Sequence, residues 1–186
     1  MITRGHVALC VEPETGPRVS LQRSVHAAEL SGYPRGMTIR AAVAEDREFI
    51  LNLAERLIEF GDVPGRSREA MVARDRSVLA TALAGGGSAV FVAVDDDGRR
   101  LGFIHLTTAD DYYDDRTTAH VADVVVAREA AGRGVGSALM ERAEQWAREQ
   151  GFAMLTLNVF AANRRARDLY ARLGFAEEWI RCLKRL

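Results

Sequence analysis

The sequence predicts a mixed α/β (α+β) fold with a mostly antiparallel central sheet, one parallel central pair of strands and about four flanking helices. Two observations support this. Apolar, β-branched and aromatic runs at 88–94 and 101–108 are separated by an acidic glycine-containing turn, which indicates a hairpin. A strand, a patterned helix and a second strand then follow over 119–159. Such a crossover places its two strands parallel and side by side.

The first part of this fold is predicted to be one strand and two helices. The strand begins at 37–40, and an amphipathic helix follows over 44–61, where Gly61 ends it. A second helix is expected over 67–83, with Ser67 as its N-cap. The hairpin described above follows this helix.

The second part is predicted to be strand, helix, strand, helix and closing strand. The segments are 119–126, 136–150, 154–159, 163–175 and 177–186. The helix over 136–150 carries the clearest amphipathic pattern of the chain. Its inward stripe is formed by Val135, Leu139, Ala143, Trp146 and Ala147.

The chain length of 186 residues fits one domain, predicted over 37–186. Residues 1–36 are rich in Pro and Gly without sustained periodicity, so they are expected to form an N-terminal extension or arm. Met37 is a candidate for the physiological start. We expect a cytoplasmic protein, because no apolar run reaches bilayer length and no signal peptide is recognisable.

Composition argues against several classes of partner and cofactor. A net charge of −1 gives no reason to expect nucleic acid as a partner. Two cysteines and four scattered histidines show no metal-ligand spacing, so no metal is expected. The only lysine is Lys184, which excludes a P-loop, a kinase or a pyridoxal enzyme. No membrane partner is expected either.

A glycine-rich turn, Gly132, Arg133, Gly134, Val135, Gly136 and Ser137, connects the strand over 119–126 to the following helix. Backbone N–H groups at a helix N-terminus lack intrahelical partners, and the helix dipole adds positive character there. Glycine lets an anion approach the backbone closely. The turn therefore predicts a phosphate site, although a tight loop without a ligand remains the alternative.

A dinucleotide fingerprint does not fit this turn. Counted from Gly132, the third glycine of that motif would fall on Ser137. The fingerprint also needs an acidic residue at the end of the next strand, and 158–160 has none. These departures make a nicotinamide cofactor a poor match.

The turn and a second motif together resemble the GNAT superfamily of N-acetyltransferases. The first motif is Arg/Gln-x-x-Gly-x-Gly/Ala, and the second is Asn-x-x-Ala-x-x-Leu-Tyr-x-x-x-Gly-Phe. The second motif is matched at Asn163, Ala166, Leu169, Tyr170, Gly174 and Phe175. The resemblance covers 38–186. The sequence departs from the first motif at its first position, where Ala131 replaces the Arg or Gln that the family usually has.

The resemblance implies acetyl-CoA as cosubstrate and an amine as acceptor, with direct transfer in a ternary complex. It places the pantetheine arm along Val124, Val125 and Val126, and the pyrophosphate on the amides of 132–137. Arg133 could add charge there or simply face solvent. Asn163 matches the family's cofactor-binding asparagine and is also a good N-cap.

The resemblance also implies catalytic roles for two residues. Tyr170 matches the tyrosine that protonates the leaving thiolate, although it lies on an inward stripe where an aromatic residue usually belongs to the core. Asp123 is the first choice as base, with a structural acceptor as the alternative; partial burial would raise its pKa. In a regular strand, His120 would point to the face opposite Asp123.

The acceptor is not specified by any motif. The acidic loop 110–115, with Tyr112 and Tyr113, could attract a cationic amine or be a solvated loop. Glu55, Glu59 and Asp62 are further candidates for the acceptor site. A small-molecule acceptor is slightly favoured over a protein, and a homodimer is expected from the resemblance. The rival interpretation is a noncatalytic acyl-CoA sensor or interaction domain on the same fold.

Overall fold

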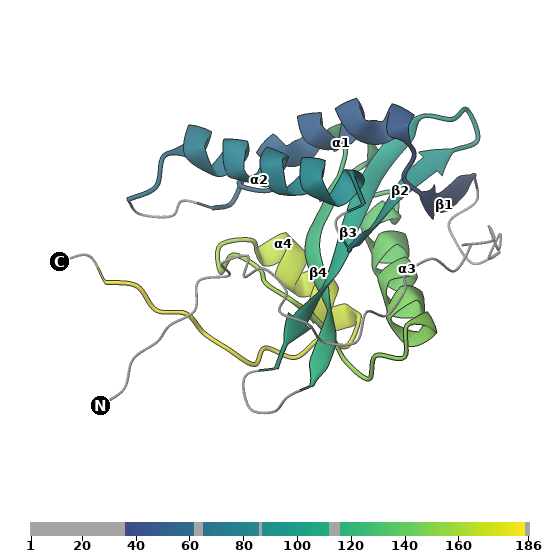
Figure 1. The fold of residues 1–186 in the computed structure, drawn as a ribbon. Helices are drawn as coiled ribbons and strands as arrows, with labels where there is room; N and C mark the ends of the chain where they lie inside the picture. Colours follow the sequence, from purple (N-terminus) through teal and green to yellow (C-terminus); the bar gives the residue numbers. More distant parts are fainter. Residues whose placement is uncertain (1–35, 62–64, 86, 112–115, 185–186) are drawn as a thin grey trace.

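A computed structural model describes residues 36–61, 65–85, 87–111 and 116–184 (Figure 1). The predicted N-terminal extension lies outside these ranges except for Gly36, and so does the centre of the acidic loop, 112–115. None of the helices within the described ranges has the length and apolar character needed to cross a membrane.

Five strands form one sheet in the order in which they occur along the chain. They are β1 (Met37–Ala41), β2 (Ala89–Asp95), β3 (Arg100–Asp110), β4 (Thr117–Val126) and β5 (Leu155–Leu157). Neighbours from β1 to β4 are antiparallel, and β4 and β5 are parallel. The predicted mixed sheet with its parallel pair is confirmed.

Two helices cover one face of the sheet (Figure 1). The helix α1 (Arg47–Leu53) is flanked by 3-10 turns η1 (Ala44–Asp46) and η2 (Ala54–Arg56), and α2 is Arg68–Leu83. The predicted single helix over 44–61 is therefore broken into shorter turns. Ser67 caps α2 as predicted, because its side chain accepts a hydrogen bond from the Ala70 amide at 3.1 Å.

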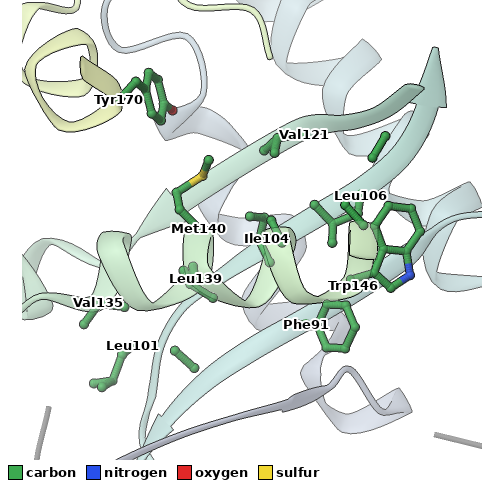
Figure 2. Close-up of a cluster of buried hydrophobic side chains, with 14 of the residues drawn as sticks. Phe91, Leu101, Ile104, Leu106, Val121, Val135, Leu139, Met140, Trp146 and Tyr170 are labelled. Carbon is green, nitrogen blue, oxygen red and sulfur yellow. The ribbon is translucent and has the colours of Figure 1, made fainter. Parts of the chain in front are cut away.

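The helices α3 (Val135–Glu149) and α4 (Arg164–Arg172) lie on the other face, and a 3-10 turn η3 (Arg128–Ala130) precedes α3 (Figure 1). Figure 2 shows the core between α3 and the strands. The predicted inward stripe of α3 is confirmed, since all five of its residues are buried. Arg142 is buried as well, 4.2 Å over the Phe91 ring and paired with Glu149.

The predicted closing strand over 177–186 is wrong for residues 177–184, which the structure describes without regular secondary structure. A strand needs a partner for its backbone groups, and sequence pattern alone does not supply one. Three apolar side chains of this segment, Trp179, Ile180 and Leu183, are exposed. The last two residues of the prediction lie outside the described part of the chain.

A buried carboxylate ties β1, β3 and η1 together. Asp46 has no exposed side-chain surface and accepts hydrogen bonds from Arg40 at 2.6 and 3.0 Å and from Arg100 at 2.6 Å. The Val43 amide donates to it at 2.9 Å. Burial acts to raise the pKa of Asp46, but these donors outweigh burial and hold the pKa well below its usual value.

We expect Asp46→Asn to lower the free energy of unfolding by about 2–4 kcal/mol at pH 7, because two part-buried arginines lose their counter-charge. The folded-state pKa of Asp46 is depressed, so its stabilisation is complete above the unfolded-state pKa of about 4 and is lost as the pH falls below it. Urea unfolding of both proteins at pH 7 and pH 3 tests this. An equal difference at the two pH values would contradict it.

Candidate functional site

The candidate site begins where β4 and β5 stop pairing. The two strands are paired only at Ala119–Leu155, His120–Thr156 and Val121–Leu157. Beyond these pairs, β4 continues to Val126 with β3 on its other side. The predicted cofactor-binding stretch 124–126 therefore lies on the part of β4 that β5 does not cover.

An irregularity in β4 lies at the same place. The register with β3 shifts between His105–Asp123 and Leu106–Val121, so Ala122 is an extra residue on β4. Val121 and Val124 are three positions apart, yet both pack against the core on the α3 and α4 face. This β-bulge reverses the alternation of side chains along β4.

The bulge brings His120 and Asp123 to the same face of the sheet. Each is flanked by a residue of the α3-side core, Val121 and Val124 respectively, so both project toward the α1 and α2 face. The expectation that His120 points away from Asp123 assumed a regular strand and is wrong for this reason.

Asp123, on β4, is held in place by a histidine of the neighbouring strand β3. His105 Nδ1 lies 2.8 Å from Asp123 Oδ2, and the His105 ring is almost fully buried while the carboxylate is partly exposed. An ionised carboxylate only accepts hydrogen bonds, so Nδ1 carries the proton. The contact orients the Asp123 carboxylate through its Oδ2, and no hydrogen bond to its second oxygen comes from the described residues.

Two further titratable side chains are close to this pair. Burial and the negative charge of Asp123 raise the pKa of Asp75, on α2, to about 6, against the effect of Arg74. Burial lowers the pKa of His120 below its usual value, with Asp123 acting in the opposite direction. The group formed by Asp75, His105, His120 and Asp123 is called the polar cluster below.

The glycine turn has the geometry expected of an anion site. Gly132 and Gly134 have φ values of +82° and +80°, which L side chains rarely adopt, and Gly134 is the N-cap of α3. The first intrahelical bond is Ala138 N to Gly134 O at 3.1 Å. Among the described residues, no hydrogen bond uses the amides of 135–137, so these donors face outward for a ligand.

Basic side chains lie on the approach to this turn. Ala131 is exposed and offers no charge, and Arg133 is exposed beside it. Arg128 is paired with Glu59 at 2.8 Å, and Arg56 pairs with the same carboxylate at 3.2 Å. Glu59 is thus engaged with two arginines, which argues against its predicted role in the acceptor site.

A cavity of about 410 Å³ lies between α1, η2 and the end of β4. It is lined by Phe49, Asn52, Leu53, Glu55, Arg56, Glu59, Arg68, Ala127, Arg128 and Glu129. Arg56 also donates a hydrogen bond to the carbonyl oxygen of Val126. The Val126 carbonyl, which belongs to the stretch 124–126 predicted to bind the pantetheine arm, therefore already accepts a hydrogen bond from the Arg56 guanidinium.

Tyr170 lies on the opposite face of the sheet from the polar cluster. It is buried in the core with Phe175, their ring centroids 5.9 Å apart, and Figure 2 shows it on α4 with the phenol oxygen turned toward the sheet. Burial raises the pKa of the Tyr170 phenol. Tyr170 is thus buried in the core, and its phenol stays protonated at neutral pH.

Asn163 is the N-cap of α4, because its Oδ1 accepts a hydrogen bond from the Ala166 amide at 3.1 Å. The side-chain amide nitrogen keeps its two donors for a ligand. Asp62 and the acidic loop residues 112–115 lie outside the described residues. Within the described ranges, no group of three His, Cys, Asp or Glu side chains could hold a metal ion.

Sequence reasoning missed His105 and Asp75. His105 pairs with Asp123 only through the register of β3 and β4, which the sequence does not specify. Asp75 could have been found from the sequence. It precedes the buried Leu79 by one helical turn, so it places a charged side chain on the inward stripe of α2.

Comparison with known proteins identifies the family. Residues 53–175 match the acetyltransferase (GNAT) family, and this match covers most of the chain. The protein therefore belongs to the GNAT acetyltransferase family. The fold agrees: a putative acetyl transferase from Pyrococcus furiosus superposes with a TM-score of 0.67 and 28% identity, over 81% of this chain and 99% of that one.

Two relatives match over shorter segments. An uncharacterized N-acetyltransferase of Methanocaldococcus jannaschii is 34% identical over 76 residues, which is 38% of this chain and 34% of that protein. Streptothricin acetyltransferase of Streptomyces lavendulae is 38% identical over 89 residues, 48% of this chain and 45% of that protein. The matched segments thus span less than half the length of either relative.

We expect Gly134→Ala to lower the free energy of unfolding by about 1–2 kcal/mol, because alanine at this positive φ is strained. Gly136→Ala is the matched control. Gly136 has an ordinary helical φ, and a Cβ there would lie 3.4 Å from Leu169 and 3.7 Å from Val126, which is van der Waals contact. Thermal unfolding compares the variants; equal losses would contradict the assignment of strain to Gly134.

Proposed function

We propose that the protein is an acyltransferase that moves the acetyl group of acetyl-CoA to a primary amine by direct attack in a ternary complex. The observation that carries this proposal is the divergence of β4 from β5. It leaves the 124–126 part of β4 without β5 beside it, with the polar cluster on one face of the sheet, the Tyr170 phenol on the other, and the unbonded amides of 135–137 after the end of the strand.

The residues present fit coenzyme A. The amides of 132–137, with the dipole of α3, would take the pyrophosphate, and Arg133 would add positive charge. The main-chain groups of Val124, Val125 and Val126 on the side away from β3 would meet the amides of the pantetheine arm. Asn163 would donate a further hydrogen bond from its amide nitrogen. Bound acetyl-CoA supplies the activated acyl group.

Proton transfer is divided between the two faces. Asp123, oriented by His105, would meet the acceptor ammonium and take its proton directly or through water. The resulting amine attacks the thioester carbon, and the thiolate that leaves takes a proton from the Tyr170 phenol. The raised pKa of Tyr170 keeps that proton in place at neutral pH until the thiolate forms.

The acceptor we propose is a small cationic amine. Asp75 and Asp123 face the space between α2 and the sheet, and two carboxylates there would favour a cation. One matched relative is named a streptothricin acetyltransferase, which agrees with a small-molecule acceptor.

The proposal is tested by thiol release from acetyl-CoA against a panel of polyamines, aminoglycosides, amino acids and peptide N-termini. We expect amine-dependent thiol release with at least one small cationic amine. Calorimetry with acetyl-CoA alone provides the independent binding measurement. Absence of acetyl-CoA binding would contradict the proposed function.

We expect Tyr170→Phe to lower kcat by roughly 10²–10⁴-fold while the Kd for acetyl-CoA stays within about twofold, because the phenol acts on the leaving thiolate and not in binding. The ring is retained, so the core around Phe175 is preserved. Unchanged kcat with unchanged acetyl-CoA binding would show that Tyr170 is not the acid. Binding without any turnover in the wild-type chain would favour the acyl-CoA sensor instead.

A further inference from the structure

The least expected member of the polar cluster is His120. It belongs to the last residues of β4 that pair with β5, and the bulge that follows turns it to the face of Asp123. It therefore lies one residue before the last β4–β5 pair, Val121 and Leu157, and four residues before Val124, where the stretch proposed to bind the pantetheine arm begins.

A chain of hydrogen bonds determines which nitrogen of His120 carries the proton. Thr156 Oγ1 lies 3.2 Å from the carbonyl oxygen of Ala119, and a carbonyl can only accept. The single hydroxyl proton of Thr156 is thus used. His120 Nδ1 lies 2.8 Å from the same Oγ1, so Nδ1–H must donate to it.

The second ring nitrogen follows from the first. A neutral imidazole with its proton on Nδ1 has a lone pair on Nε2. Burial lowers the pKa of His120 below its usual value of 6.5, so the ring is neutral at pH 7. Nε2 is then a proton acceptor held in one tautomer.

Resting on the proposed function, we propose that His120 is a catalytic base of this site: its Nε2 accepts the proton that the acceptor ammonium loses, while Asp123 holds that ammonium by charge. In this refinement of the proposed function, Asp123 anchors the ammonium by charge and the proton passes to His120. The proton balance closes. Of the two protons lost by the ammonium, one reaches solvent through His120 and the other replaces the proton that Tyr170 gives to the thiolate.

Three other titratable groups among the described residues belong to the polar cluster, and their effects must be separated from that of His120. They are Asp75 on α2, His105 on β3 and Asp123 on β4. Asp75 is the group whose titration is most easily confused with that of His120 in a pH profile, because the pKa of Asp75 is about 6. An Asp75→Asn variant removes it from the pH profile and serves as the control.

We expect kcat/KM of the wild-type protein to fall at acidic pH, below the ordinary histidine pKa of about 6.5, because the lowered pKa of His120 delays its protonation to that range and a protonated ring can no longer accept. His120→Asn keeps an amide donor near the Nδ1 position but cannot take a proton. It should lower kcat roughly 10²–10⁴-fold and abolish this acidic limb, with the Kd for acetyl-CoA unchanged. Asp75→Asn should retain the limb. Unchanged kcat and an unchanged limb in His120→Asn would overturn the inference.

Thr156 gives a second, more specific test. Thr156→Val removes the hydroxyl that fixes the tautomer and should lower kcat about fivefold to tenfold, as for the loss of one hydrogen bond. Thr156→Ser keeps the hydroxyl and should restore the wild-type rate. A purely structural role of Thr156 would instead change thermal stability without this dependence on the hydroxyl, which would count against the inference.

The tautomer is measurable without any substrate. Two-bond ¹H–¹⁵N correlation spectra of the free protein should show His120 protonated at Nδ1 and unprotonated at Nε2 at pH 7.5. Protonation at Nε2 would overturn the inference whatever the activity. Failure of the wild-type chain to acetylate any amine, with the Nδ1–H tautomer present, would instead overturn the proposed function and the base role that rests on it.

Discussion

The early end of the parallel pairing between β4 and β5 is the constraint on which the rest of the site depends. Three residue pairs join these strands, and within the described residues β3 is the only strand paired with β4 beyond Val121. A sheet that closed here would use the backbone groups of β4 internally and would separate its two faces completely. Here the pairing instead ends next to the bulge that turns His120 and Asp123 to the same face, and the glycine turn follows after the end of β4.

The two faces of the sheet supply different chemical environments around this part of β4. The α1 and α2 side holds the polar cluster, in which hydrogen bonds fix the orientation of Asp123 and the tautomer of His120. The α3 and α4 side is an apolar core in which the Tyr170 phenol remains protonated. An amine arriving on one face and a thiolate departing toward the other would each meet a group in the protonation state that it needs.

Much of this fold could be predicted from sequence because its signals are local. The apolar runs of the strands, the Ser67 cap and the stripe on α3 depend on neighbouring residues, and the structure confirms them. The bulge could not be predicted, because it is a property of the register between strands, and the face of His120 was wrong as a result. The segment 177–184 resembles a strand in composition, but a strand also requires a partner that local pattern does not reveal. Site roles inferred from the family resemblance remain proposals.

The central claim is that coenzyme A lies along the free part of β4 with its pyrophosphate on the turn before α3. Backbone amide chemical shifts of the ¹⁵N-labelled protein, followed during titration with acetyl-CoA, test it most directly. The account predicts saturable shifts centred on the amides of 132–137 and 124–126, with residues of β1 unaffected. Saturable shifts confined to another surface, or none at millimolar acetyl-CoA, would contradict it.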